Sequence, residues 1–173
     1  RYQLYVRSMQ EDGLGNLYLR FNELKQALER EGLFNAIHKK EIPSMPERLA
    51  ILSAKQGAAL QDVLRTLHQR YPLVARDIYP VPVQGRDAYQ VIVDTLKKVD
   101  EMGYSTILLV RGGGSIEDLW NFNEEALARC IYDLKTPIIT GVGHETDYTL
   151  VDYVSDLRAP TPTAAAVAAV PSQ

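Results

Sequence analysis

Two short glycine-containing segments hold most of the residues whose types could do chemistry. The first is Arg111-Gly112-Gly113-Gly114-Ser115, and the second is Gly141-Val142-Gly143-His144-Glu145-Thr146-Asp147. Glycines let the backbone turn tightly and approach a ligand, and successive N–H groups in such a turn can bind an anion. Arg111 adds a planar, permanent charge that suits phosphate oxygens, and His144 and Asp147 are residue types that move protons. These features predict a reaction centred on a phosphate, with Gly112, Gly113, Gly114 and Ser115 as its binding turn.

Each of these residues also has a purely structural interpretation. The glycines could form a tight turn without a ligand, with Ser115 as a helix cap, and Arg111 could pair with Glu117 or Asp118. His144 could be a neutral ring that is hydrogen-bonded in the core. It lies between glycines and acidic residues, however, and such a sequence is uncommon in a hydrophobic core. If its segment is helical, His144 and Asp147 lie three residues apart on one face, where a carboxylate can fix the imidazole tautomer.

For two further groups of residues, a functional and a structural interpretation both remain open. Asp62 lies early in an expected helix, where an acid is favoured by the helix N-terminus whether or not it is functional. Trp120 and Phe122 stand among asparagines. These aromatic rings could stack on nucleic-acid bases or cover an edge of the sheet, and we favour the second interpretation.

The elements that must position these residues alternate between strands and helices from Arg48 onward. Apolar runs predict strands near 49–52, 78–83, 106–110 and 138–140, and helical periodicity predicts helices near 60–67, 88–99 and 124–134. This alternation indicates an α/β fold with an open parallel sheet and helices on both faces. Because Pro80 and Pro82 lack N–H groups, we expect their strand at the edge of the sheet.

Right-handed crossovers then give a flavodoxin-like strand order, with the second strand on one side of the first and the third on the other. In such sheets ligands bind beyond the carboxyl ends of the strands. The loops expected there are 53–57, 84–87, 111–115 and 141–147. We therefore expect a cleft with Gly112–Gly114 on one side and His144 on the other, with Arg111 pointing into it.

The flanking segments predict a second, smaller unit. Residues 2–9 alternate in polarity like a strand, Gly13 and Gly15 mark a turn, and a helix from Leu17 is expected to stop at Gly32. We divide the chain into residues 1–16, the end of an N-terminal domain; 17–47, a helix and linker; and 48–173, the α/β domain. Thr163 is expected to cap a final helix in an alanine run. The chain starts at Arg1 without a methionine and stops just after Pro171, which favours a fragment of a longer protein.

Composition narrows the possible classes of protein. The chain has 173 residues, is 46% hydrophobic and carries a formal net charge of -3, so we expect a globular domain that does not coat nucleic acid by bulk charge. The single cysteine, Cys130, excludes an internal disulfide and is expected in the core, whereas His38 and His68 are expected at the surface. No residue spacing compels a metal site. No apolar run is long enough to span a bilayer, and a cytoplasmic location is expected.

The same residues resemble the large subunit of exodeoxyribonuclease VII. The similarity rests on the two glycine segments, on their continuation Ile116-Glu117-Asp118-Leu119-Trp120-Asn121-Phe122-Asn123, and on residues 156–166; residues 57–62 and 79–85 are also similar. It covers the chain from about Arg48 to its end. Several long motifs in one order make a chance match very improbable.

The resemblance implies an enzyme that degrades single-stranded DNA from either end to oligonucleotides by phosphodiester hydrolysis, with a role in DNA catabolism and repair. It implies an N-terminal OB-fold domain, of which residues 1–16 would be the end, and a C-terminal helical region that binds copies of a small subunit. The catalytic residues carry over onto Asp62, Arg111, His144 and Asp147. The family is described both as metal-independent and as magnesium-dependent, so magnesium use stays open, and no other cofactor is implied.

The alternative function is a small-molecule kinase or nucleotide-phosphate-binding protein that uses the glycine turn for phosphates. Kinases of the NAD-kinase type place Gly-Gly-Asp-Gly after a strand, whereas the third position here is Gly114. A P-loop is excluded because no Lys-Ser/Thr pair follows the glycines.

Overall fold

The computed structural model describes residues 2–112, 118–142 and 148–171, with side chains from Gly15 onward except that of Asp118. The described strands are β1 (Arg48–Ser53), β2 (Ala75–Pro80), β3 (Thr106–Val110), β4 (Ile138–Gly141) and β5 (Leu157–Arg158). They form one parallel sheet in the order β2-β1-β3-β4-β5. The predicted α/β class and flavodoxin-like order are confirmed. Strand β2, which ends at Pro80, lies at an edge of the sheet as predicted.

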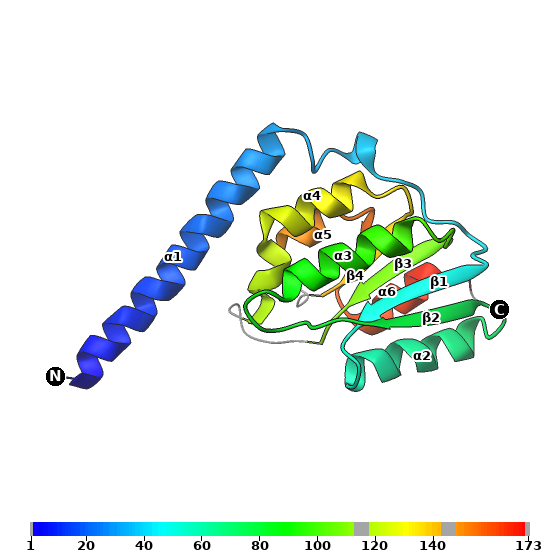
Figure 1. The fold of residues 1–173 in the computed structure, drawn as a ribbon, viewed down its shortest axis with the longest axis horizontal. Helices are drawn as coiled ribbons and strands as arrows, with labels where there is room; N and C mark the ends of the chain where they lie inside the picture. Colours follow the sequence, from blue (N-terminus) through cyan, green and yellow to red (C-terminus); the bar gives the residue numbers. More distant parts are fainter. Residues whose placement is uncertain (1, 113–117, 143–147, 172–173) are drawn as a thin grey trace.

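Helices cover both faces of this sheet (Figure 1). The helices that follow β1, β2 and β3 are α2 (Ala58–Arg70), α3 (Ala88–Asp100) and α4 (Glu125–Asp133), and the last two are α5 (Leu150–Val154) and α6 (Pro162–Ala169). One hydrophobic core joins the sheet to α3, α4 and α5, and a second joins it to α2 and α6. The central strands therefore have no solvated face.

The side chains of the central strands alternate between these two cores. In β1, Ala50 and Leu52 pack into the core under α3 and α4, and Leu49 and Ile51 pack into the core over α2 and α6. Successive side chains of a strand point to opposite faces of the sheet, so a strand covered on both sides must be apolar throughout. This is why β1 and β3 read as continuous apolar runs.

The N-terminal segment differs from the prediction. Residues 2–9, expected as a strand, belong to the long helix α1 (Tyr2–Arg30), which also runs through Gly13 and Gly15. Helix formation is cooperative, and the last turns of α1 are anchored, since Leu28 is buried in the core beside α4. The stabilisation gained by extending an anchored helix outweighs the cost of about 1 kcal/mol that each internal glycine adds. The assignment of residues 1–16 to the end of an OB-fold domain stays a prediction.

Other local predictions have mixed outcomes. Helix α1 ends at Arg30, two residues before the predicted stop at Gly32, whose φ of 88° suits glycine. Cys130 is buried, and His38 and His68 are exposed, as expected. The cap of α6 was predicted wrongly: Thr161, not Thr163, accepts the hydrogen bond from the Ala164 N–H group, at 3.0 Å, because Pro162 takes the first helical position. The remaining described elements are two 3₁₀ segments, η1 (Ala36–His38) and η2 (Asp118–Asn123).

Candidate active site

A small cavity opens at the carboxyl ends of β1 and β3, where the topology predicts a ligand site. Its volume is about 230 Å³. The cavity is formed by the end of β1 and its loop, the first turn of α2, and the end of β3; its lining residues are Ser53, Ala54, Gln56, Gly57, Ala58, Ala59, Leu60, Val83, Val110, Arg111 and Gly112. Most of these are small residues, so backbone groups come close to the cavity space.

Arg111 is the cation of this cavity. It directly follows β3, and only 7% of its surface is exposed. Its backbone N–H group donates to the Gly141 carbonyl at 3.0 Å, which fixes the end of β3 against the end of β4. A buried guanidinium needs oxygen partners to balance its desolvation. Its position against the cavity suits an anion as one of them.

Gly112 extends the lining and keeps it open. A Cβ atom added at Gly112 would have no heavy atom within 4 Å. The backbone at this position therefore faces open space, as expected for a residue that lets a ligand approach the main chain.

The first turn of α2 forms the opposite part of the lining. Gly57 precedes the helix with φ of 137°, a conformation that favours glycine, and no side chain caps this end. The first N–H groups of a helix have no partner within it, and the helix dipole adds partial positive charge there. The cavity thus combines the Arg111 charge with a helix terminus of the same sign.

Asp62 lies one turn further along α2. It shares a helix face with Ala58, which lines the cavity. The Asp62 carboxylate is 3.3 Å from the Arg65 guanidinium, and 43% of its side chain is exposed. The structure therefore places Asp62 next to the cavity lining but not in it.

The remaining predicted site residues lie outside the described residues: Gly113, Gly114, Ser115, His144 and Asp147. The strands that precede them are described. Val110 at the end of β3 lies in register with Gly141 at the end of β4. The two glycine segments therefore leave the sheet from neighbouring strands, at the edge that holds the cavity.

A buried hydrogen-bond network connects the residues on both sides of 143–147. The Asp152 carboxylate accepts from the Thr149 N–H group at 2.9 Å, from the Thr149 hydroxyl at 3.0 Å and from the Thr140 hydroxyl at 3.0 Å. Thr140 precedes the second glycine segment and Thr149 follows it. Burial raises the pKa of Asp152 above its ordinary value, and the bonds from Thr149 and Thr140 offset part of this rise. Sequence analysis missed Asp152, although its place at the third position of a helix after Thr149 fits a capping box.

The segment with Trp120 and Phe122 is mainly structural. Phe122 is fully buried, which confirms the interpretation of this ring as a cover for the sheet. The Asn121 amide donates to the Gly85 carbonyl at 2.7 Å and accepts from the Tyr89 N–H group at 3.1 Å. Trp120 is half-buried, with the Arg20 guanidinium 5.2 Å from the centre of its ring. This segment fixes the β2–α3 loop and α1 to the rest of the domain.

Comparison with known proteins gives a consistent result over the whole chain. The family model described as "Exonuclease VII, large subunit" matches residues 33–173. The chain belongs to this family. Within it, the chain is 52% identical to the exodeoxyribonuclease 7 large subunit of Staphylococcus haemolyticus (strain JCSC1435) over 172 residues, which are 99% of this chain and 39% of that protein. It is 54% identical to the subunit of Lysinibacillus sphaericus (strain C3-41) over 173 residues, 99% of this chain and 38% of that protein.

The family relationship concerns a limited part of those proteins. The chain spans about 39% of the length of the S. haemolyticus relative. In the part of the chain that the structure describes, no helix is long and apolar enough to cross a membrane. The same described residues contain no cluster of three or more histidines, cysteines or acids that could hold a metal ion.

Proposed function

We propose that the protein hydrolyses phosphodiester bonds of single-stranded DNA from either end and releases oligonucleotides, in the cytoplasm, and that this chain carries the catalytic domain. The observation that carries the proposal is the nearly buried Arg111 against a cavity of about 230 Å³ at the carboxyl-end edge of the sheet. A cavity of this size suits a phosphate group. The name exodeoxyribonuclease 7 large subunit, which the relatives bear, supports the choice of a DNA substrate.

In the proposed reaction, Arg111 and the turn from Gly112 to Ser115 hold the scissile phosphate. As water attacks phosphorus, negative charge increases on the phosphate oxygens that are not bridging. Fixed positive groups stabilise this charge without reorganising, which is commonly the largest catalytic contribution. The N-terminus of α2 faces the same cavity and adds to the positive potential.

Proton transfer is assigned to His144, with Asp147 orienting its ring. The segment with both residues begins beside Arg111, since the Arg111 N–H group bonds to the Gly141 carbonyl. One proton must leave the attacking water and one must reach the departing oxygen, and His144 serves one of these steps. Asp62, one turn from the cavity lining, positions the attacking water or a magnesium ion if the enzyme uses one.

The proposed partners are single-stranded DNA and a small subunit of the same enzyme. The chain has a net charge of -3, and single-strand binding needs a basic surface with stacking platforms. We therefore expect residues 1–173 by themselves to bind oligonucleotides weakly and to cleave them poorly. Tight binding by this chain alone that persists at high salt would contradict this expectation.

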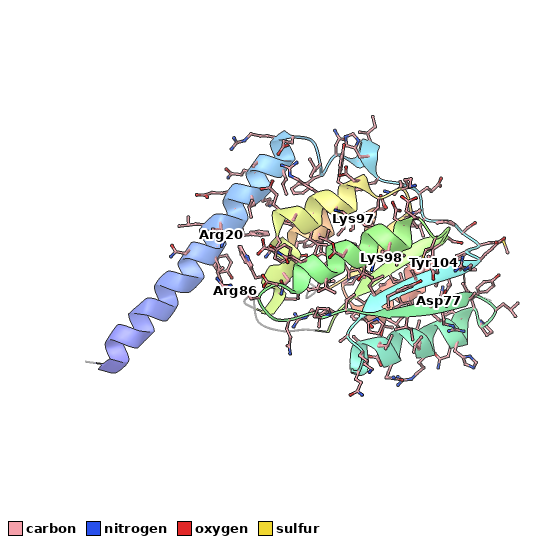
Figure 2. All side chains as sticks on the ribbon, in the orientation of Figure 1. Arg20, Asp77, Arg86, Lys97, Lys98 and Tyr104 are labelled. Carbon is pink, nitrogen blue, oxygen red and sulfur yellow. The ribbon has the colours of Figure 1, made fainter. Side chains whose placement is uncertain are left out.

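The proposal is tested with the complete large subunit that carries this chain, assembled with its small subunit. Single-stranded DNA labelled at either end is digested by the wild type and by Arg111→Ala, His144→Ala and Lys98→Ala. Lys98 lies near the end of α3 (Figure 2), away from the cavity, and is the control. We expect the first two variants to lose activity and the control to keep it. Full activity of Arg111→Ala and His144→Ala, or transfer of phosphate from ATP without DNA cleavage, would overturn the proposal.

A further inference from the structure

A second, wider groove adjoins the phosphate cavity. Its volume is about 640 Å³, and its lining is Ala54, Lys55, Gln56, Pro80, Val81, Pro82, Val83 and Gln84. Ala54, Gln56 and Val83 line both spaces, so the groove and the cavity are continuous along these residues. The cavity suits one phosphate, whereas the groove has a volume typical of small-molecule sites, about 300–1,000 Å³.

The groove lies beyond the ends of β1 and β2, which end in register at Ser53 and Pro80. The Val81 N–H group donates to the Ser53 carbonyl at 2.8 Å, which is the last backbone hydrogen bond between the β1 and β2 segments among the described residues. Beyond it, Pro82 has no N–H group with which to continue the sheet. Val81 is buried and Pro82 is exposed, so the groove has an apolar floor and an apolar wall. Such surfaces suit the sugar and the base face of a nucleotide.

Lys55 provides positive charge at this groove. Its side chain is exposed, and among the described residues it has neither a hydrogen bond nor an ion pair. Several other lysines are held by neighbours: Lys40 lies 3.1 Å from the Asp156 carboxylate, and Lys135 lies 3.0 Å from that of Glu101. The Lys55 ammonium is therefore available to an anion from outside the chain, and the exposed amides of Gln56 and Gln84 offer hydrogen bonds beside it.

We propose that this groove binds the nucleotide next to the scissile phosphate, with Lys55 on the adjacent phosphate of the strand. The inference rests on the proposed function, because it takes the cavity at Arg111 as the place of the scissile phosphate. The proposed occupant is single-stranded DNA. Because the cavity and the groove adjoin, consecutive phosphates of one strand fit one in each space. Contact through the apolar wall, the amides and the phosphate predicts binding with little dependence on base sequence.

The test uses the assembled enzyme with Lys55→Ala, Lys55→Arg, Arg111→Ala and the matched control Lys98→Ala. Steady-state kinetics on single-stranded DNA are measured at several salt concentrations, and thermal unfolding confirms that each variant is folded. For Lys55→Ala we expect KM to rise about twofold to fivefold, as for the loss of one solvent-exposed ion pair, with kcat unchanged. We also expect the slope of log(kcat/KM) against log salt to decrease in magnitude by about 0.7, the value for one phosphate contact with a single strand.

Lys55→Arg should restore most of the wild-type KM and of the wild-type salt slope, and Lys98→Ala should leave KM and the salt slope unchanged. An inactive Arg111→Ala together with an unaltered KM and salt slope in Lys55→Ala would overturn the groove proposal and leave the proposed function standing. A loss of kcat in Lys55→Ala at constant KM, or an equal change of KM in Lys98→Ala, would also overturn it. Full activity of both Lys55→Ala and Arg111→Ala would overturn the groove proposal and the proposed function together.

Discussion

The amino ends and the carboxyl ends of the strands carry charged and polar residues that are used in different ways. At the amino ends of the strands these groups bind one another: the Tyr104 hydroxyl donates to the Asp77 carboxylate at 2.6 Å (Figure 2). The Arg48 guanidinium lies 4.4 Å from the centre of the Tyr104 ring. Asp100 likewise accepts from the N–H groups of Lys135 and Thr136. At the carboxyl-end edge, Arg111 and Lys55 border open spaces instead. The polar groups at the amino ends bind one another, whereas those at the carboxyl ends border a cavity and a groove.

The largest effect that this comparison predicts is on activity, for Arg111→Lys. Lysine keeps the charge but lacks the planar fork, so we expect a loss of activity on the order of a hundredfold in the assembled enzyme with the fold intact. The matched control is Arg48→Lys at the amino-end edge, which should cleave DNA normally. The measurement is kcat/KM on single-stranded DNA, with circular dichroism as the check of folding. Near-normal cleavage by Arg111→Lys would mean that Arg111 is structural.

Two glycines that end neighbouring strands provide a second contrast. A Cβ atom at Gly141 would lie 2.9 Å from the Thr161 carbonyl oxygen and 3.1 Å from Ala165 Cβ, so α6 would have to shift. We expect Gly141→Ala to lower the free energy of unfolding by about 1–3 kcal/mol, as measured by urea denaturation.

Gly112→Ala is the matched variant at the cavity beside Arg111, where we propose that the scissile phosphate binds. Space is open there, so we expect a change in stability within about 0.5 kcal/mol. The new methyl group would meet the phosphate, however, and kcat/KM should fall roughly tenfold or more. Equal losses of stability in the two variants would contradict the distinction between a packed strand end and an open one.

Asp152 predicts a dependence of stability on pH. Because burial raises its pKa in the folded state, the folded protein binds the proton more tightly than the unfolded chain. The stability that this proton contributes is complete below the ordinary aspartate pKa of about 3.9 and is lost as pH rises through the raised pKa. The expected slope is at most about 1.4 kcal/mol per pH unit.

Asp152→Asn cannot titrate and lacks this contribution. Urea unfolding of both proteins from pH 4 to pH 8 measures it, since the difference between the two curves removes the other titrating groups. We expect the difference to change at acidic pH and to become constant above the raised pKa. A difference that is constant over the whole range would show that the carboxyl pKa is not raised by folding.

The smallest effect is expected at the amino-end edge. Tyr104→Phe removes the hydroxyl that bonds to both Asp77 and Tyr79. Because the Asp77 side chain is about half-exposed, solvent weakens this bond, and the change should cost about 0.5–1.5 kcal/mol of stability without altering kcat/KM. Differential scanning calorimetry and the DNA cleavage assay measure the two quantities. Loss of activity at unchanged stability would mean that this edge also takes part in function.

The sequence alone was sufficient for the α/β architecture from Arg48 onward, because the strands and helices there follow from short-range patterns. Continuous apolar runs identify strands that are covered on both faces, helical periodicity identifies the covering helices, and Pro80 marks the edge strand. The handedness of the crossovers then leaves one economical strand order. The same reasoning placed Arg111 and Gly112 at the carboxyl-end edge, where the structure has its cavity.

Tertiary contacts decided the rest. Residues 2–9 are helical because the other end of α1 is anchored in the core through Leu28, and a local alternation of polarity cannot reveal this. Asp152 is buried because β4 and α5 close around it. The groove at Lys55 lies where β1 and β2 end together, at Ser53 and Pro80, and this depends on the register in which the two strands pair. Local sequence encodes the elements, whereas burial, cavities and the environment of a charge follow from how distant elements pack.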